Sequence, residues 1–245
     1  MSPELETITE RIIKLLSKAE RTDNPAEAEA FFAKAAALQA AHAIDEIMLN
    51  AAAGKHVDDI EKKTYLFKGS YAPANVWMVH VLAQQLNSRV IQTKLGGSEV
   101  RCNVHGFRSD LERLDLLFTS LLIQGTRAMK TFIKNHEYYG SCTAAEKYQM
   151  RKSFLMGFGE GAADQLAEAN RAAEKEQETK TPGVGLVLVD RKAQVNTAVE
   201  QSYGRLSSSR GTKRDYSGLA GGRAAGRQAD MGRKQVGGTK KALGS

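Results

Sequence analysis

Residues 7–48 read TITERIIKLLSKAERTDNPAEAEAFFAKAAALQAAHAIDEIM, and this spacing predicts a helical hairpin followed by a third short helix. Thr7 and Glu10 are placed as a capping box, in which the hydroxyl and the carboxylate each bond a free backbone N–H at a helix start. Apolar side chains then recur on one helical face, at Ile8, Ile12, Leu15, Leu16 and Ala19. The first helix of the hairpin is therefore amphipathic.

The turn of the hairpin lies at residues 22–25, where the sequence is Thr-Asp-Asn-Pro. Asn24 is positioned to cap the second helix, and Pro25 occupies its first position, where the missing N–H costs nothing. The face of the second helix carries Ala28, Phe31, Ala35, Leu38 and His42. Asp45 is expected to cap a third helix that ends near Gly54. We therefore predict an N-terminal helical domain over residues 1–54.

The order and spacing of one set of hairpin residues form a recognisable motif. It consists of Leu15, Leu16, Lys18, Ala19, Glu20, Thr22, Glu27, Ala28, Lys34, Ala35, Leu38, His42 and Ile44. This motif resembles the domain-of-unknown-function 2786 family of bacteria and their phages, and the segment that follows resembles one that often accompanies that domain in actinobacterial and phage proteins. The family supplies no catalytic residues. Some members carry a metalloprotease-like module with a His-Glu-x-x-His helix, but this sequence lacks that motif, so the activity is not expected here.

The segment after the hairpin predicts strand, helix, strand and strand in that order. Thr64–Lys68 and Arg89–Leu95 have strand composition, and Pro73 opens a helix between them. Gly96–Gly97 is a hairpin signal, and Glu99–Phe107 after it alternates between two faces. On that last strand Val100, Cys102 and Val104 share one face, and Glu99, Arg101 and Asn103 share the other.

Two long helices are expected next. Ser109 with Glu112, and Thr143 with Glu146, have the spacing of capping boxes at their starts. Gly125 lies within the apolar stripe of the first of these helices and indicates a close helix contact. A small, mostly antiparallel sheet packed on long helices is an α+β fold.

The second long helix is expected to stop at residues 181–183, which read Thr-Pro-Gly. Val184–Val189 is a continuous apolar run, which we interpret as a buried strand. Asp190 is placed to cap a last helix that ends at about Ser202. The α+β core domain is thus predicted over residues 62–202.

Residues 203–245 form a glycine-rich and strongly basic segment. The segment has a net charge of +8, so residues 1–202 carry −1 of the chain's +7. Ten of the 22 glycines lie from Gly204 onward, and such a composition buries too little apolar surface to offset its ordering entropy. We therefore predict a flexible tail that is disordered in isolation, with one alternative: a short helix that places Arg223 and Arg227 one turn apart.

The tail carries the candidate nucleic-acid-binding residues. They are Arg205, Arg210, Lys213, Arg214, Arg223, Arg227, Arg233, Lys234, Lys240 and Lys241. Arginine and lysine neutralise phosphates and release counterions, so such binding weakens steeply with salt. Tyr203 and Tyr216 are candidates for stacking on unpaired bases. The alternative is a solubilising tail or a tail that docks on a protein partner.

Other chemically suggestive groups are explained better by packing. His42, Asp45 and Glu46 form a metal-like grouping, but a hydrogen-bonded histidine on an apolar helix face is the preferred interpretation. The glycines of 157–161 superficially resemble a phosphate loop, yet they lie inside a helical stripe, so close helix packing is preferred. Trp77 is interpreted as a packing residue.

No catalytic residue, metal or cofactor is assigned from the sequence. His80, His105 and His136 are scattered, and no nucleophile or carboxylate partner can be located for them. The chain has no apolar run of membrane-helix length and no signal core, and Cys102 and Cys142 are interpreted as free thiols in a reducing compartment. We expect a protein of the bacterial cytoplasm with no membrane contact.

The preferred function is a non-enzymatic accessory protein of a phage or actinobacterium that associates with DNA or RNA. In this hypothesis the tail supplies affinity, and alanine at Arg223 and Arg227 weakens binding. Two alternatives remain open. One is a metal-dependent nuclease or hydrolase with a site in the core, and the other is an adaptor that docks a protein partner on the hairpin.

Overall fold

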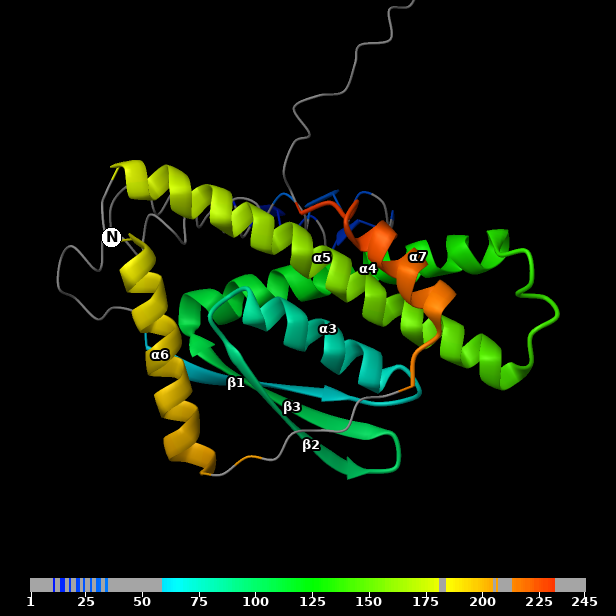
Figure 1. Ribbon diagram of the computed structural model, residues 1–245, viewed down its shortest axis with the longest axis horizontal. Coiled ribbons are helices and arrows are strands. Elements are labelled where there is room, and N and C mark those ends of the chain that lie inside the picture. Colours follow the sequence, from blue (N-terminus) through cyan, green and yellow to red (C-terminus); the bar gives the residue numbers. More distant parts are fainter. Residues whose placement is uncertain are drawn as a thin grey trace, which may run out of the picture.

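The computed structural model describes residues 59–180, 184–204, 206 and 213–231, together with positions 11, 14, 15, 18, 21, 22, 24, 27, 30, 31 and 34. From residue 59 to residue 231 the described ranges contain three strands and five helices, and Figure 1 shows their arrangement. The fold class is α+β, as the sequence predicts. None of the helices in the described ranges has the length and apolar character that crossing a membrane requires.

The sheet has three antiparallel strands in the order β1-β3-β2. Its elements are β1 (Ile60–Phe67), β2 (Arg89–Gly96) and β3 (Glu99–Phe107), and α3 (Ala72–Gln84) connects β1 to β2. Thr64 of β1 and Ile91 of β2 both lie opposite Asn103 of the central strand. The predicted β-α-β-β order and antiparallel pairing are therefore confirmed.

One face of this sheet is covered by helices and forms the core. Tyr65 and Phe67 of β1 pack edge-on against Phe118, with ring centroids 5.8 and 5.6 Å apart. Cys102 and Val104 of β3 point to the same side and are fully buried. The helices on this side are α3, α4 (Arg108–Asn135) and α5 (Ala144–Lys180). The core is thus built from alternate residues of the strands and the apolar stripes of these helices.

Of the three predicted capping boxes, the one at Thr7 and Glu10 lies outside the described residues, and the two at the long helices have different outcomes. At the start of α5 the Thr143 N–H donates to Glu146 Oε2 at 2.8 Å, and the Glu146 N–H donates to Thr143 Oγ1 at 3.3 Å, which confirms that box. The box at Ser109 and Glu112 is wrong, because α4 begins at Arg108 with Phe107 as its N-cap and no side-chain cap. Strand β3 runs directly into this helix, which leaves no room for a capping turn.

The predicted strand at Val184–Val189 is also wrong. These residues begin α6 (Val184–Tyr203). Val189 is 68% exposed, so the end of the run is not buried either. A short apolar run has the same composition in a strand and in a helix, so periodicity over six residues cannot separate them. The helical pattern becomes clear later in α6, where Val195 and Val199 lie one turn apart and are both buried.

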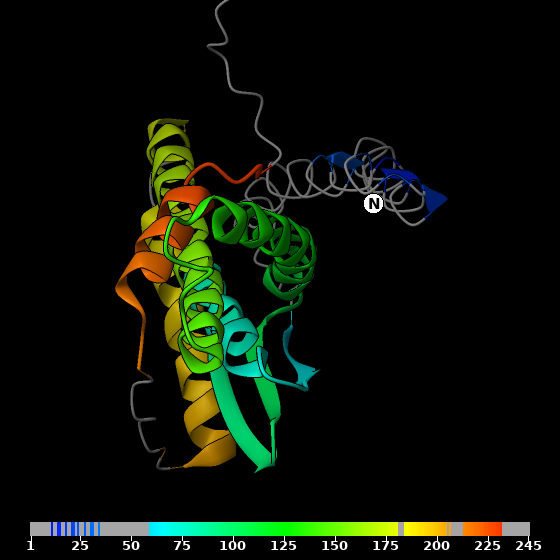
Figure 2. The same cartoon turned by 90° about the vertical axis from the view of Figure 1, so that its right-hand side faces the viewer.

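The expectation of little fixed structure after Gly204 is wrong for Tyr216–Gly226, which form α7. Asp215 caps this helix, because its Oδ1 accepts from the Gly218 N–H at 2.7 Å. Figure 2 shows α7 lying against α5. Five glycines line this contact, which we call the glycine seam: Gly157 and Gly161 of α5 and Gly218, Gly222 and Gly226 of α7.

The glycine seam explains why composition misled the prediction. A side-chain carbon at any of its five positions would overlap a backbone atom of the facing helix. Two bare backbones therefore meet along their length, and many small dispersion contacts replace large apolar side chains. The close packing predicted for residues 157–161 is confirmed, as is the contact at Gly125, which lies against the Phe158 ring.

Candidate nucleic-acid interface

The second face of the sheet is only partly covered and forms the candidate interface. Because β-strand side chains alternate, the residues that point away from the core share this face. We call its exposed and half-buried part the open sheet face, which consists of Lys62, Thr64, Leu66, Ile91, Thr93, Arg101 and Asn103. Thr64 Oγ1 donates to Asn103 Oδ1 across the strands at 2.9 Å, so two of its polar side chains are held in place.

The open sheet face is positively charged. Lys62 and Arg101 are exposed, and within the described ranges neither has a carboxylate at ion-pair distance. Nearby Lys68 is neutralised by Glu99, whose Oε1 lies 2.8 Å from Lys68 Nζ. Leu66 is 51% exposed and lies beside these cations. The face thus combines uncompensated positive charge with accessible apolar surface.

Helix α6 closes one end of this face. Arg89 Nη1 donates to Asn196 Oδ1 of α6 at 3.3 Å and lies 3.5 Å from Glu200 Oε1. Tyr203 at the end of α6 bonds His105 of β3. In Figure 1, α6 runs past the end of the sheet at which β1 begins and β3 ends. A ligand on the open sheet face therefore meets α6 at that end.

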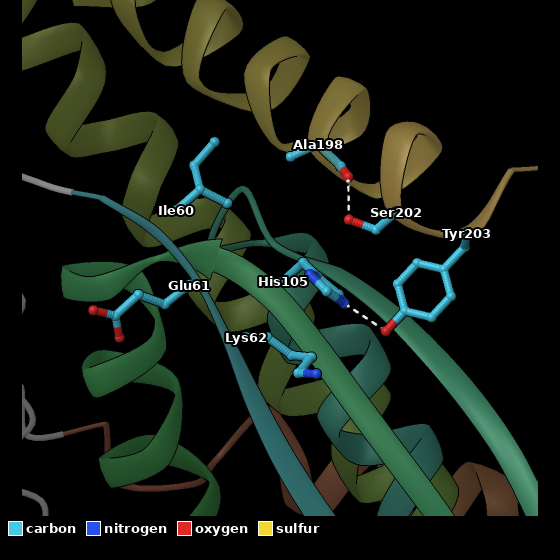
Figure 3. A pocket seen from close by; sticks show the side chains of 7 residues that line it. All are labelled: Ile60, Glu61, Lys62, His105, Ala198, Ser202 and Tyr203. Carbon is cyan, nitrogen blue, oxygen red and sulfur yellow. Dashed lines mark hydrogen bonds between the residues drawn. The ribbon is translucent and has the colours of Figure 1, made fainter.

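A cavity of about 460 Å³ lies where α6 meets the sheet, and we call it the sheet-end pocket. Its lining residues, drawn in Figure 3, are Ile60, Glu61, Lys62, His105, Ala198, Ser202 and Tyr203. Figure 3 shows Lys62, His105 and Tyr203 grouped together, with Glu61 turned away from them. The Glu61 carboxylate is neutralised by Arg108, whose Nη2 lies 2.6 Å from Glu61 Oε1. Lys62 therefore gives the pocket its charge.

A short hydrogen-bonded chain lies on the floor of the pocket. His105 Nε2 is 2.9 Å from the Tyr203 hydroxyl oxygen, and Asn103 Nδ2 donates to the same oxygen at 3.3 Å. The pKa of His105 is lowered, first by burial and then by the charge of Lys62. His105 is therefore a neutral imidazole at pH 7.

Three of the tail cations predicted from the sequence are ion-paired within the molecule. Arg214 Nη1 lies 2.8 Å from Glu160 Oε1, and its guanidinium carbon is 4.6 Å from the centre of the Trp77 ring. Arg223 and Arg227 both bond Asp164 Oδ2, at 2.8 and 3.1 Å. The alternative of a helix with these arginines one turn apart is thus confirmed, but the helix does not present them as free charges.

Arg223 and Arg227 change the pKa of the Asp164 carboxylate that they share. Burial raises the pKa of Asp164, but the hydrogen bonds and charges of Arg223 and Arg227 outweigh burial, and the pKa is lowered overall. Among the other tail candidates, Lys213 is exposed. Arg205, Arg210, Arg233, Lys234, Lys240 and Lys241 lie outside the described residues.

His80 and His136, the other histidines of the described part, are held in packing and capping contacts. The His80 ring lies tilted against the Trp77 ring, with centroids 5.5 Å apart, and burial lowers the pKa of His80. His136 Nε2 lies 3.3 Å from Ser217 Oγ, and that hydroxyl donates to Asp215 at 3.0 Å. A Ser-His-Asp triad requires the carboxylate on His Nδ1, whereas this Nδ1 has no hydrogen-bond partner in the described part. The group is therefore the capping network of α7.

The metal-like grouping of His42, Asp45 and Glu46 lies outside the described residues. Within the residues that are described, no three His, Cys, Asp or Glu side chains are grouped so as to hold a metal ion. Cys102 and Cys142 are free thiols, as the sequence predicts.

Sequence reasoning identified the polar side of β3 but not the site it belongs to. The alternation of Glu99–Phe107 places Arg101 and Asn103 together, and the strand register confirms this. Lys62 and the bond between His105 and Tyr203 were missed. The two bonded residues are about 100 positions apart, and only the placement of α6 brings them together.

The fold and the site define a small α+β protein with one open, basic sheet face. Residues 7–46 match a family described as protein of unknown function (DUF2786), in agreement with the resemblance of the hairpin motif. No curated protein and no solved structure matches the chain. The open sheet face lies entirely outside the matched segment.

Proposed function

We propose that this protein is a non-enzymatic accessory protein that binds nucleic acid through its open sheet face. The observation that carries the proposal is the pair of exposed cations, Lys62 and Arg101, which have no carboxylate partner among the described side chains. Phosphate groups supply the missing negative charge, and the released counterions drive binding. Thr64, Thr93 and Asn103 offer hydrogen bonds to sugars and phosphates between these cations.

The C-terminal cations have a supporting role in this proposal. Arg223 and Arg227 share Asp164 near the surface, where ion pairs are worth only about 0–1 kcal/mol, so a phosphate can exchange for the carboxylate. The remaining cations of the segment add long-range attraction. The resemblance of the hairpin to a bacterial and phage family supports a bacterial cytoplasm as the setting, where nucleic acid is accessible.

The test is fluorescence anisotropy with labelled single- and double-stranded DNA and RNA over a series of salt concentrations. The test variant is the double substitution Lys62→Gln and Arg101→Gln. Removing two phosphate contacts reduces the slope of log affinity against log salt by about 1.4–1.8. The matched control is Lys130→Gln with Lys134→Gln, because both lysines are exposed on α4, the helix that packs on the covered face.

A chain that ends at Met231 separates the two basic regions. It keeps α7 and the open sheet face, and it removes Arg233, Lys234, Lys240 and Lys241. We expect weaker but still salt-dependent binding that remains sensitive to the Lys62 and Arg101 substitutions. The proposal is wrong if the full chain binds no nucleic acid at low salt. It is also wrong if the test and control variants lose affinity equally.

A further inference from the structure

The sheet-end pocket has a proton donor available in either arrangement of its hydrogen bonds. The Tyr203 oxygen already accepts from Asn103 Nδ2. If the tyrosine hydroxyl donates to His105 Nε2, then Nδ1 of the neutral imidazole carries a proton that has no acceptor among the described residues. If instead Nε2–H donates to the tyrosine oxygen, the hydroxyl proton is free. One donor therefore remains unused beside the Lys62 ammonium.

A lysine charge and an unused neutral donor favour an anion as ligand. Lys62 has no carboxylate partner in the described part of the chain, and the one carboxylate of the lining, Glu61, is held by Arg108. The Ser202 hydroxyl also lines the pocket and donates to the Ala198 carbonyl, which leaves its oxygen able to accept from a protonated ligand. Phosphate suits this set, because it combines charge with several acceptor oxygens.

The position of the pocket indicates which phosphate fits. Helix α6 closes this end of the open sheet face, so a nucleic-acid strand lying along the face cannot continue past Tyr203. A terminal phosphomonoester carries about −1.5 to −2 charges at pH 7, and an internal phosphodiester carries one. A phosphorylated end of a nucleic-acid strand is therefore attracted to the Lys62 ammonium more strongly than an internal phosphodiester is.

We propose that the sheet-end pocket binds the terminal phosphate of a nucleic-acid strand that lies on the open sheet face, with Lys62, His105 and Tyr203 as its contacts. This inference rests on the proposed function. It makes the protein a reader of strand ends, and the ligand class is an oligonucleotide with a phosphorylated terminus.

The experiment compares four oligonucleotides of one sequence, with a 5′-phosphate, a 3′-phosphate, both or neither, by anisotropy on the full chain. A phosphate at one of the two ends is expected to raise the affinity about 10-fold or more, because an oligonucleotide without it lacks a hydrogen bond to a charged group. Lys62→Gln and Tyr203→Phe each remove that preference. Arg101→Gln is the control, because Arg101 is an exposed residue of the open sheet face outside the pocket lining, so its loss weakens all four oligonucleotides alike.

The outcomes distinguish the two proposals. Equal binding of all four oligonucleotides overturns the terminal-phosphate site and leaves nucleic-acid binding intact. An end preference that survives both Lys62→Gln and Tyr203→Phe also overturns it, because the phosphate is then recognised elsewhere. Absence of binding by every oligonucleotide overturns both proposals. Thermal unfolding of each variant confirms that it is folded before its affinity is compared.

Discussion

Gly222 is the residue at which the glycine seam is least tolerant of change. A carbon added there would overlap the Phe154 carbonyl oxygen, which belongs to a helix backbone and cannot move aside. We predict that Gly222→Ala lowers the free energy of unfolding by about 1–3 kcal/mol, as overpacking typically does. The measurement is urea denaturation.

The control for this substitution is Gly140→Ala. Gly140 has open space around its missing side chain and no positive φ, so alanine there should leave stability within about 0.5 kcal/mol. Equal effects of the two substitutions would contradict the close approach of α5 and α7.

His80 and His105 make stability depend on pH below neutrality. Burial lowers the pKa of both, and Lys62 further lowers that of His105. The unfolded chain therefore takes up protons before the native state does. The stability present above the ordinary histidine pKa of about 6.5 is lost as the pH falls toward the native values.

We predict a lower free energy of unfolding at pH 5.5 than at pH 7.5, measured by urea denaturation at both values. His80→Gln and His105→Gln should each reduce this difference. A difference that neither substitution changes would assign the pH dependence to other groups.

At the scale of elements, α7 completes the helical layer. Gln124 of α4 makes two hydrogen bonds to the backbone of Asp230, just beyond α7. Its Oε1 accepts from the Asp230 N–H at 2.8 Å, and its Nε2 donates to the Asp230 carbonyl at 3.0 Å. Gly221 of α7 lies against the Phe132 ring, which itself packs on Phe154 with centroids 4.9 Å apart. Removing α7 therefore uncovers aromatic surface and leaves buried polar groups without partners.

We predict that a chain ending at Leu206, which keeps α6 and Tyr203, melts more than about 5 °C below a chain ending at Met231. Differential scanning calorimetry measures both. Equal melting temperatures would mean that α7 contributes nothing to the stability of the core.

The elements predicted correctly have signals that are local in the sequence. Pro73 opens α3, and Thr143 with Glu146 caps α5 through residues three positions apart. The error at Val184–Val189 comes from a run too short for periodicity to separate helix from strand, whereas the error at α7 has a tertiary origin. A helix of glycine and alanine is stable only against a matching surface, and that surface, on α5, lies about 60 positions earlier in the chain.

At the scale of the whole molecule, the sequence predicts the fold class and the excess of positive charge but not where that charge is accessible. The tail carries a net +8, yet Asp164 and Glu160 of α5 hold three of its arginines. The accessible cations of the described surface include Lys62 and Arg101, in a part of the chain with almost no net charge. Charge counting gives the net charge of a segment, and only the fold shows which of its cations are accessible.

This charge arrangement gives a prediction that rests on the proposed function. Asp164→Asn frees Arg223 and Arg227, so it should raise affinity for nucleic acid and steepen the salt dependence, measured by anisotropy. The control is Glu168→Gln, which removes the same charge one turn along α5 from an exposed side chain. Equal effects would show that net charge alone matters and that the arginines are not released.

The glycine seam also has a consequence for the nascent chain during synthesis. The ribosome makes α5 first, and its glycine surface has no covering until residues 216–226 have emerged. Elongation proceeds at about 5–20 residues per second, so a nascent chain spends seconds with this surface bare. The newly made protein is therefore most exposed to proteases and chaperones just before its last helix docks.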